Sequence, residues 1–365
     1  MIGSTLRVRY EITSQLASTP LFTVYGARDR VLNTDVSVRV LNPPFDQETA
    51  FVKRLNEVVE QWVGLSHPNL QRLMNVDSDE SRQFLVGEVA KGTNLLDRIK
   101  KLAPFTAPTS IAIAIGICEG LAAIHEAGKV HGDVGAHNVN VGPSQEVQLE
   151  LGGLWECYGA SETAGVALLP SMAPYLAPEV SAGEMPSARS DVYGVGVVLY
   201  ELLTGRLPYT GDKPLATAMR HATQPTPSVR EANHTIPVVL DEIIKKAMAK
   251  DPAQRYPNAG LMLSDLRVLQ DAMRFGRSLS WPLGGAAPSP EPGAATVAPK
   301  MSAVRDESKT RTREQVDLED RDSGDVPTWM KMVIAFLMGT LAIDGIGLRC
   351  VQHAQTAHGE RARTS

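Results

Sequence analysis

The order of strand-like and helix-like segments limits the folds that this chain can adopt. Residues 36–41 are β-branched and alternate in polarity, and residues 84–86 are a second short apolar run, so both predict strands. From Pro108 onward the apolar spacing is helical, with a long apolar helix predicted over residues 111–127. Strands that come first and helices that come later indicate an α+β chain whose two subdomains join near Gly92.

Further helices complete the globular part. Residues 51–65 have helical spacing and end before Pro68, which stops the helix. Later helices are predicted over residues 191–203, 237–250 and 259–273. A chain of 365 residues is long enough for a two-lobed domain with accessory segments.

The composition excludes some classes of function. Hydrophobic residues make up 43% of the chain and charged residues 21%, as in globular proteins. The formal net charge of -5 gives no basic field, so no nucleic-acid partner is expected. Cys118, Cys157 and Cys350 are widely spaced, which predicts reduced thiols and no metal site. The first ten residues contain no apolar run that resembles a signal peptide.

The composition changes after Trp281. Residues 276–328 are rich first in Gly, Ala and Pro and then in mixed charge, which predicts a disordered linker. Residues 329–349 contain an apolar run of about 17 residues, the lower limit for crossing a bilayer. Its apolar side chains favour insertion by roughly 4 kcal/mol, and Asp344 opposes it by up to about 2.5–3.5 kcal/mol. We expect a transmembrane helix there, followed by a short tail (350–365); the alternative is a helix docked on the globular part or a partner.

Five motifs occur in order along the globular part. His131 to Asn138 reads H-x-D-x-x-x-x-N, and the other four are Ser66-His-Pro-Asn69, Tyr175-Leu-Ala-Pro-Glu179, the helix Asp191 to Tyr209, and Lys250-Asp-Pro-Ala-Gln-Arg255. Together they cover roughly residues 8 to 272, and the chain resembles bacterial eukaryotic-type Ser/Thr protein kinases. The resemblance implies a two-lobed protein-kinase-like fold, with an N-lobe at residues 1–91 and a C-lobe at residues 92–275.

The same resemblance implies a structural framework inside the C-lobe. Glu179 should pair with Arg255, and a buried pair of this kind leaves a stranded charge when one partner is lost. Asp191 should accept backbone N–H bonds from the catalytic loop, which contains His131 as a structural residue. Asp133 and Asn138 lie at the positions of the substrate-hydroxyl acceptor and of the second metal ligand. The alternative is that these two side chains only brace the loop.

Many other residues that phosphoryl transfer requires are replaced. The loop that should cover the phosphates has Ala17, Thr19 and Phe22 in place of glycines, and Pro20 removes a donor. Arg39 falls at the position of the phosphate-binding lysine, where an arginine is not an equivalent substitute.

The helix glutamate that should pair with this lysine position is replaced by Val58. Glu57 and Glu60 lie about 100° and 200° away on the helix, so only a register shift would let one replace it. Leu151 lies at the position of the metal aspartate and cannot bind Mg²⁺, which requires oxygen ligands. Glu150 precedes it on a predicted strand and is expected to face the opposite side.

Three further positions are changed near the catalytic loop. Gly135 replaces the loop lysine, Met172 the threonine before Tyr175, and Gly132 the arginine that receives a phosphorylated activation loop. The adenine slot should have apolar walls, but its two positions are Ser37 and Asn140, so weak nucleotide binding is expected.

These replacements predict a catalytically impaired pseudokinase that acts as a scaffold or regulator in signalling. One alternative is a weakly active or unorthodox Ser/Thr kinase that uses Asp133, Asn138 and Arg39; another is a nucleotide-sensing switch without turnover. No cofactor is expected, and ATP and magnesium would bind, through Arg39 and Asn138, only if an alternative holds. Expected partners are proteins, such as another kinase or an envelope component, and the cytoplasmic membrane. The chain should cross that membrane once near its C-terminus, with the kinase-like domain in the cytoplasm.

Overall fold

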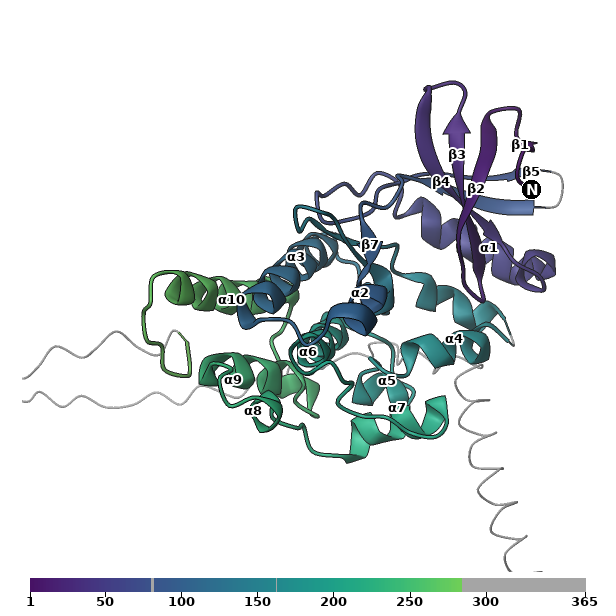
Figure 1. Cartoon of the computed structure of the whole chain (residues 1–365). Coiled ribbons are helices and arrows are strands. Elements are labelled where there is room, and N and C mark those ends of the chain that lie inside the picture. Colours follow the sequence, from purple (N-terminus) through teal and green to yellow (C-terminus); the bar gives the residue numbers. More distant parts are fainter. Residues whose placement is uncertain (80–81, 162, 284–365) are drawn as a thin grey trace, which may run out of the picture.

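The computed structural model describes residues 1–79, 82–161 and 163–283, which form two lobes (Figure 1). The N-lobe contains a six-stranded antiparallel sheet in the order β1-β2-β3-β4-β6-β5. Its strands are β1 (Thr5–Leu6), β2 (Tyr10–Ser18), β3 (Phe22–Asp29), β4 (Thr34–Leu41), β5 (Leu73–Asp79) and β6 (Arg82–Gly87). The C-lobe is mainly helical, so the predicted α+β two-lobed kinase-like fold is confirmed.

Strand β4 shows how the side-chain alternation builds the N-lobe. Val36, Val38 and Val40 are buried in one apolar cluster of the sheet. Successive side chains of a strand point to opposite faces, so Ser37 and Arg39 face the other way, toward the C-lobe. The register pairs Ser37 with Gly87 and Arg39 with Leu85 on β6.

Helix α1 (Thr49–Glu60) follows the short helix η1 (Phe45–Gln47) and covers the second face of the sheet (Figure 1). It buries four apolar side chains: Phe51, Leu55, Val58 and Val59. The predicted helix to Leu65 is too long, because the chain turns after Gln61 and reaches a positive φ of 92° at Gly64. A left-handed residue of this kind ends a helix and favours glycine.

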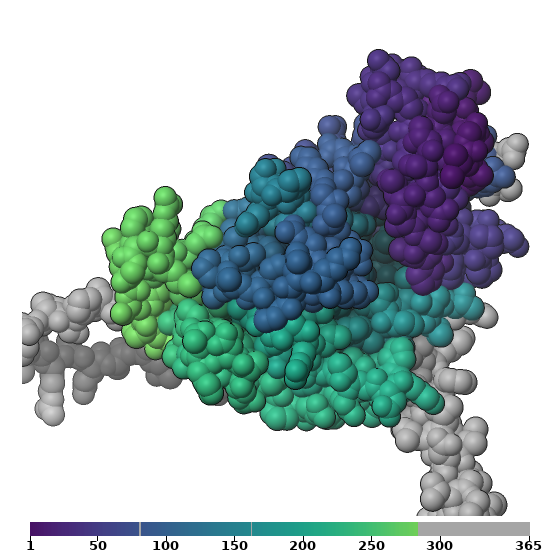
Figure 2. All heavy atoms as spheres, viewed as in Figure 1, coloured from purple at the N-terminus to yellow at the C-terminus, as the bar shows by residue number. Residues whose placement is uncertain are grey.

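The helices of the C-lobe pack around two central helices, α3 and α6. The helices are α2 (Leu95–Leu102), α3 (Ala107–Glu126), α4 (Ala164–Met172), α5 (Pro178–Ser181), α6 (Ala188–Thr204), α7 (Pro214–Thr223), α8 (Val229–Ala232), α9 (Val238–Ala247) and α10 (Ala259–Arg274). Helix α3 packs against α6 and α10, and α6 packs against α9. Short helices η2 (Ala136–Asn138), η3 (Leu154–Ala160) and η4 (Pro252–Gln254) complete the lobe. Figure 2 shows the N-lobe, in purple, lying against the larger C-lobe, in blue to green.

A small sheet joins the lobes. It consists of β7 (Thr93–Asn94), β8 (Val139–Val141) and β9 (Val147–Leu149), in that order. Leu70 of the N-lobe forms a parallel bridge with Leu149, so the segment after α1 is tied to the C-lobe. Gly120 of α3 allows this close approach, because a Cβ there would lie 2.9 Å from the Asn69 carbonyl oxygen.

Among the described residues, one helix is long and apolar enough to span a bilayer, namely α3, and more than half of it is buried inside the C-lobe. Past residue 275, the predicted end of the C-lobe, Leu279, Trp281 and Leu283 still pack against the core. The predicted transmembrane helix at residues 329–349, the tail and most of the linker lie outside the described residues, so they remain predictions. Cys118 and Cys157 are buried free thiols.

Candidate functional site

Asp191 at the start of α6 holds the backbone of the catalytic loop. Its two carboxylate oxygens accept hydrogen bonds from the backbone N–H groups of His131 (2.9 Å) and Gly132 (2.8 Å). His125 Nε2 donates a third bond at 2.9 Å. These are the backbone bonds that the resemblance implies for Asp191.

The expected ion pair between Glu179 and Arg255 is present in the C-lobe. Arg255 Nη1 and Nη2 each donate to one oxygen of Glu179 at 2.7 Å, and Ser190 Oγ donates at 2.7 Å as well. Burial acts to raise the pKa of Glu179, but the hydrogen bonds from Arg255 and Ser190 outweigh it and leave that pKa below its usual value. A bidentate pair that is almost fully buried fixes α5 against η4.

Asp133 in the catalytic loop is fully engaged in hydrogen bonds. Asn138 Nδ2 donates to its carboxylate at 2.8 Å and also to its backbone carbonyl, and His137 Nε2 donates to both carboxylate oxygens at 3.2 Å. Burial acts to raise the pKa of Asp133, but the neighbouring His137 outweighs it, so the pKa is lowered. The structure therefore brings Asp133 and Asn138 together, within hydrogen-bond distance of each other.

His137 is a site residue that the sequence reasoning missed. Its ring fills the space that a side chain at position 135 would occupy, because a Cβ on Gly135 would lie 2.6 Å from His137 Cε1. Burial acts to lower the pKa of His137, but the charge and hydrogen bonds of Asp133 raise it overall. Its Nδ1 is buried without a hydrogen-bond partner among the residues that the structure describes. The one sequence feature that could have pointed to His137 is Gly135, a glycine where the family has a lysine.

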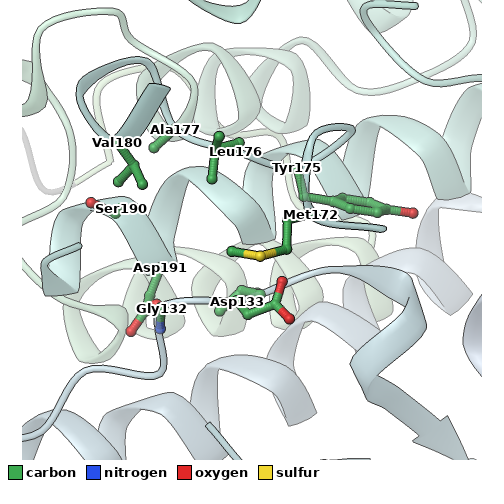
Figure 3. Close-up of a pocket in the computed structure, with 10 residues that line it drawn as sticks. Gly132, Asp133, Met172, Tyr175, Leu176, Ala177, Val180, Ser190 and Asp191 are labelled. Atoms are coloured by element: carbon green, nitrogen blue, oxygen red, sulfur yellow. The ribbon is translucent and has the colours of Figure 1, made fainter. Parts of the chain in front are cut away.

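The segment that contains Met172 and Tyr175 leaves little space beside Asp133. Met172, Tyr175 and Asp133 line the same small hollow (Figure 3). Its volume is about 20 Å³. Tyr175 points its hydroxyl away from Asp133 and donates to Glu201 at 2.7 Å. Burial raises the pKa of Glu201 and of Tyr175. The hollow is smaller than any ligand site of ordinary size.

Arg39 of the N-lobe and Glu150 of the C-lobe form an ion pair, on the side of the chain opposite Leu151 as expected. Arg39 Nη2 donates to Glu150 Oε2 at 3.0 Å and also to Gln71 Oε1. Strand β9 ends at Leu149, but the Glu150 N–H still donates to the Asn138 carbonyl at 2.8 Å, in register with the β8–β9 pair. The side chains therefore still alternate: Glu150 faces Asn140, whereas Leu149 and Leu151 pack against the core.

The polar residues Ser37 and Asn140 are buried and already paired. Asn140 Nδ2 donates to Glu150 Oε1 at 2.8 Å. Ser37 Oγ donates to the Glu88 carbonyl at 2.8 Å, and Gln71 Nε2 donates to the same oxygen at 2.7 Å. The two polar side chains at the expected adenine position are thus already hydrogen-bonded to other groups of the protein.

Helix α1 offers an apolar face at the position of the missing glutamate. Val58 is 1% exposed and lies in the main core, whereas Glu57 pairs with Arg54 at 3.1 Å on the surface. The register shift that would bring an acidic residue to Arg39 is therefore not observed. Trp62 lies against Gly153, where a Cβ would be 2.5 Å from the indole nitrogen.

The segment after Leu151 folds back onto the catalytic loop and α1. Trp155 of η3 lies over Gly132, where a Cβ would be 2.0 Å from Trp155 Cδ1. Arg54 of α1 donates to Glu156 Oε2 at 2.8 Å. The indole of Trp155 thus fills the space that a side chain at position 132, the position of the expected arginine, would need. The ion pair with Arg54 holds the segment after Leu151 against α1.

Hydrogen bonds and apolar packing hold the turn formed by Thr19, Pro20 and Leu21 against the N-lobe. Thr19 Oγ1 accepts from the Phe22 N–H at 3.0 Å, and Asn42 Nδ2 donates to the Thr19 carbonyl at 2.9 Å. Leu21 and Phe22 are buried in the main core. This turn is fixed in the N-lobe and is unsuited to folding over phosphates.

The residues present do not fit a magnesium–nucleotide complex of the kind that the resemblance implies. Leu151 packs against the apolar core and supplies no side-chain oxygen. The Asn138 side chain is hydrogen-bonded to Asp133, and Arg39 is paired with Glu150.

Comparison with known proteins gives a consistent family. A family model described as protein tyrosine and serine/threonine kinase matches residues 16–264. A probable serine/threonine-protein kinase of Clostridium perfringens is 31% identical over 270 residues, covering 74% of this chain and 39% of that protein. PknB of Mycobacterium tuberculosis is 32% identical over 271 residues, with 72% and 43% covered. The chain spans about two fifths of the length of these relatives.

Solved structures agree on the fold. The PknI kinase domain of Mycobacterium tuberculosis superposes with a TM-score of 0.60 at 21% sequence identity, covering 74% of this chain and 99% of that chain. A single-substitution variant of the same domain gives a TM-score of 0.59 at 20% identity. At this identity the likeness concerns the fold alone.

Proposed function

Because this chain belongs to the protein tyrosine and serine/threonine kinase family, we propose that it is a catalytically impaired member that acts as a scaffold or regulator in signalling. One observation carries the proposal: Arg39 is paired with Glu150 beside Leu151, the residue at the metal-aspartate position. Phosphoryl transfer depends on positioning and charge neutralisation, and loss of one such group can cost about 10³–10⁵ in rate.

Other features of the site support the same proposal. Val58 is buried in the core, and the turn over the expected phosphate position is pinned by Asn42. Trp155 lies against Gly132, next to the position of the arginine that would receive a phosphate on the activation segment. These changes lie in both lobes, so restoring a single residue would leave the others in place.

A second candidate function is a weakly active Ser/Thr kinase. It is favoured by the short contact between Asn138 Nδ2 and the Asp133 carboxylate, which keeps these two side chains together, and by the activity in the names of the relatives. In this reading Asp133 would accept the substrate hydroxyl proton, and the neighbouring His137, which lowers the pKa of Asp133, would favour its ionised form.

Phosphate transfer from labelled ATP separates the two candidates. We expect the full chain, with Mg²⁺ or Mn²⁺, to give no more autophosphorylation or transfer to generic protein acceptors than its Asp133→Asn variant. Transfer that disappears in Asp133→Asn would overturn the impaired reading. A thermal shift with ATP that does not depend on metal would instead favour nucleotide sensing.

We also propose that the protein is anchored in the cytoplasmic membrane with its kinase domain in the cytoplasm. The support is the apolar sequence 332–348, flanked by Trp329 and Lys331 on one side and Arg349 on the other. The full chain should fractionate with membranes and resist carbonate extraction, whereas a chain without residues 329–349 should be released. Equal release of both chains would contradict the anchor.

A further inference from the structure

The charge of Arg39 is already matched inside the protein. The guanidinium lies in the interlobe cleft with only 7% of the residue exposed. Its Nη2 contacts the Glu150 carboxylate at 3.0 Å and the Gln71 side-chain oxygen. A guanidinium that is removed from water requires a partner anion, and its planar fork suits carboxylates and phosphates equally well.

Glu150 is held in place by the C-lobe. Its second carboxylate oxygen accepts from Asn140 on β8 at 2.8 Å, so both oxygens are paired. Its backbone N–H donates to the Asn138 carbonyl, and its own carbonyl accepts from His131 Nε2 at 3.2 Å. These three contacts to neighbouring residues direct the carboxylate toward Arg39.

Gln71 links this ion pair to the N-lobe backbone. Its side-chain oxygen accepts from Arg39, and its Nε2 donates to the Glu88 carbonyl at 2.7 Å. Its own N–H donates to the Leu149 carbonyl at 2.8 Å. Gln71 thus holds the Arg39 guanidinium in place, and Arg39 is an anion site in which the bound anion is the protein's own carboxylate.

We propose that Glu150 is an internal counter-ion, which occupies the anion site at Arg39 and thereby keeps polyphosphate groups away from that guanidinium. This inference deepens the proposed function and rests on it, because it gives a physical reason for the weak nucleotide binding that we expect of a chain with a cation at position 39. A polyphosphate that enters must displace Glu150, whose carboxylate then repels it at close range.

The test measures binding of inorganic tripolyphosphate to the full chain in detergent, with EDTA present, by calorimetry. The unmodified chain should show weak binding or none. Glu150→Ala and Glu150→Gln should each bind at least about tenfold more tightly. Adding Arg39→Met to either variant should remove the gain. Glu11→Gln, which breaks an exposed ion pair with Arg30, is the control and should leave binding unchanged.

Equal binding by the unmodified chain and the Glu150 variants would overturn the proposal, as would a gain that survives Arg39→Met. If the variants do not fold, hydrogen exchange of the unmodified chain replaces them. The amides of Gln71 and Glu150 should then be protected without ligand, and tripolyphosphate should not change this. Rapid exchange there, or protection that requires tripolyphosphate, would refute the counter-ion. Phosphate transfer is measured separately, so failure here is distinguishable from failure of the proposed function.

Discussion

Gly132→Ala tests the docking of Trp155 on the catalytic loop more directly than any change at a charged residue. Gly132 has a φ of 78°, and a Cβ at this position would lie 2.0 Å from Trp155 Cδ1 and 2.4 Å from its Nε1. Two costs therefore add. The left-handed backbone costs an alanine about 1–2 kcal/mol, and forcing a methyl group into packed side chains costs about 1–3 kcal/mol.

Gly128 provides the matched control for this variant. Its φ of 70° carries the same backbone cost, but nothing lies within 4 Å of a Cβ placed there. We expect Gly128→Ala to lower the free energy of unfolding by about 1–2 kcal/mol and Gly132→Ala by about 2–5 kcal/mol. The difference between the two measures the clash with the indole.

Denaturation by urea, followed by far-ultraviolet circular dichroism, gives both values. In a background that carries Trp155→Ala, the two glycine variants should become equally destabilised, because the clashing ring is gone. Equal costs in the natural background would refute the placement of Trp155 over Gly132. The same clash predicts that Gly132→Arg, which restores the family residue, destabilises the protein.

Three other outcomes follow from the contacts described. Glu179→Ala should destabilise the domain by about 3–5 kcal/mol in denaturation, since it strands the Arg255 charge, whereas Glu119→Ala at an exposed pair should change it by less than about 1 kcal/mol. Ser161→Ala should cost about 1 kcal/mol on the same scale, because Ser161 Oγ accepts from two N–H groups at the start of α4; an unchanged midpoint would exclude this cap. Burial and the charge of Lys250 lower the pKa of His221 to about 3. Below pH 6.5 the unfolded chain therefore binds more protons than the folded chain, so the stability of the domain falls as the pH falls. This group should make the domain about 2–3 kcal/mol less stable at pH 4.5 than at pH 7. His221→Gln should lose that part of the pH dependence, and an identical pH profile would contradict it.

The sequence was a good guide to features that depend on local pattern or on ordered motifs. The strand over residues 36–41 and the long helix α3 follow from their apolar residue patterns, and both are buried on more than one face. The pairing of Glu179 with Arg255 came from the resemblance. Helix α1 ends earlier than its spacing indicated, because Gly64 takes a left-handed conformation that periodicity does not register.

The remaining features depend on contacts between residues whose relation is not periodic. His137 fills the space left by Gly135, and Trp155 fills the space beside Gly132. Each glycine could be recognised as a missing side chain, but not which neighbour replaces it. The side-chain alternation that placed Glu150 opposite Leu151 continues past the end of β9, because the Glu150 N–H still bonds the Asn138 carbonyl. The alternation could not show that this face meets Arg39, which comes from the other lobe.

The packing of Trp62 on Gly153 and of Trp155 on Gly132 also gives this protein an optical readout of its own. Both indoles lie where the segment after Leu151 meets α1 and the catalytic loop. The chain has four tryptophans, so replacing Trp281 and Trp329 by phenylalanine would leave only this pair to emit. A red shift of their fluorescence would then report release of the segment by a partner protein, in real time and without an attached dye.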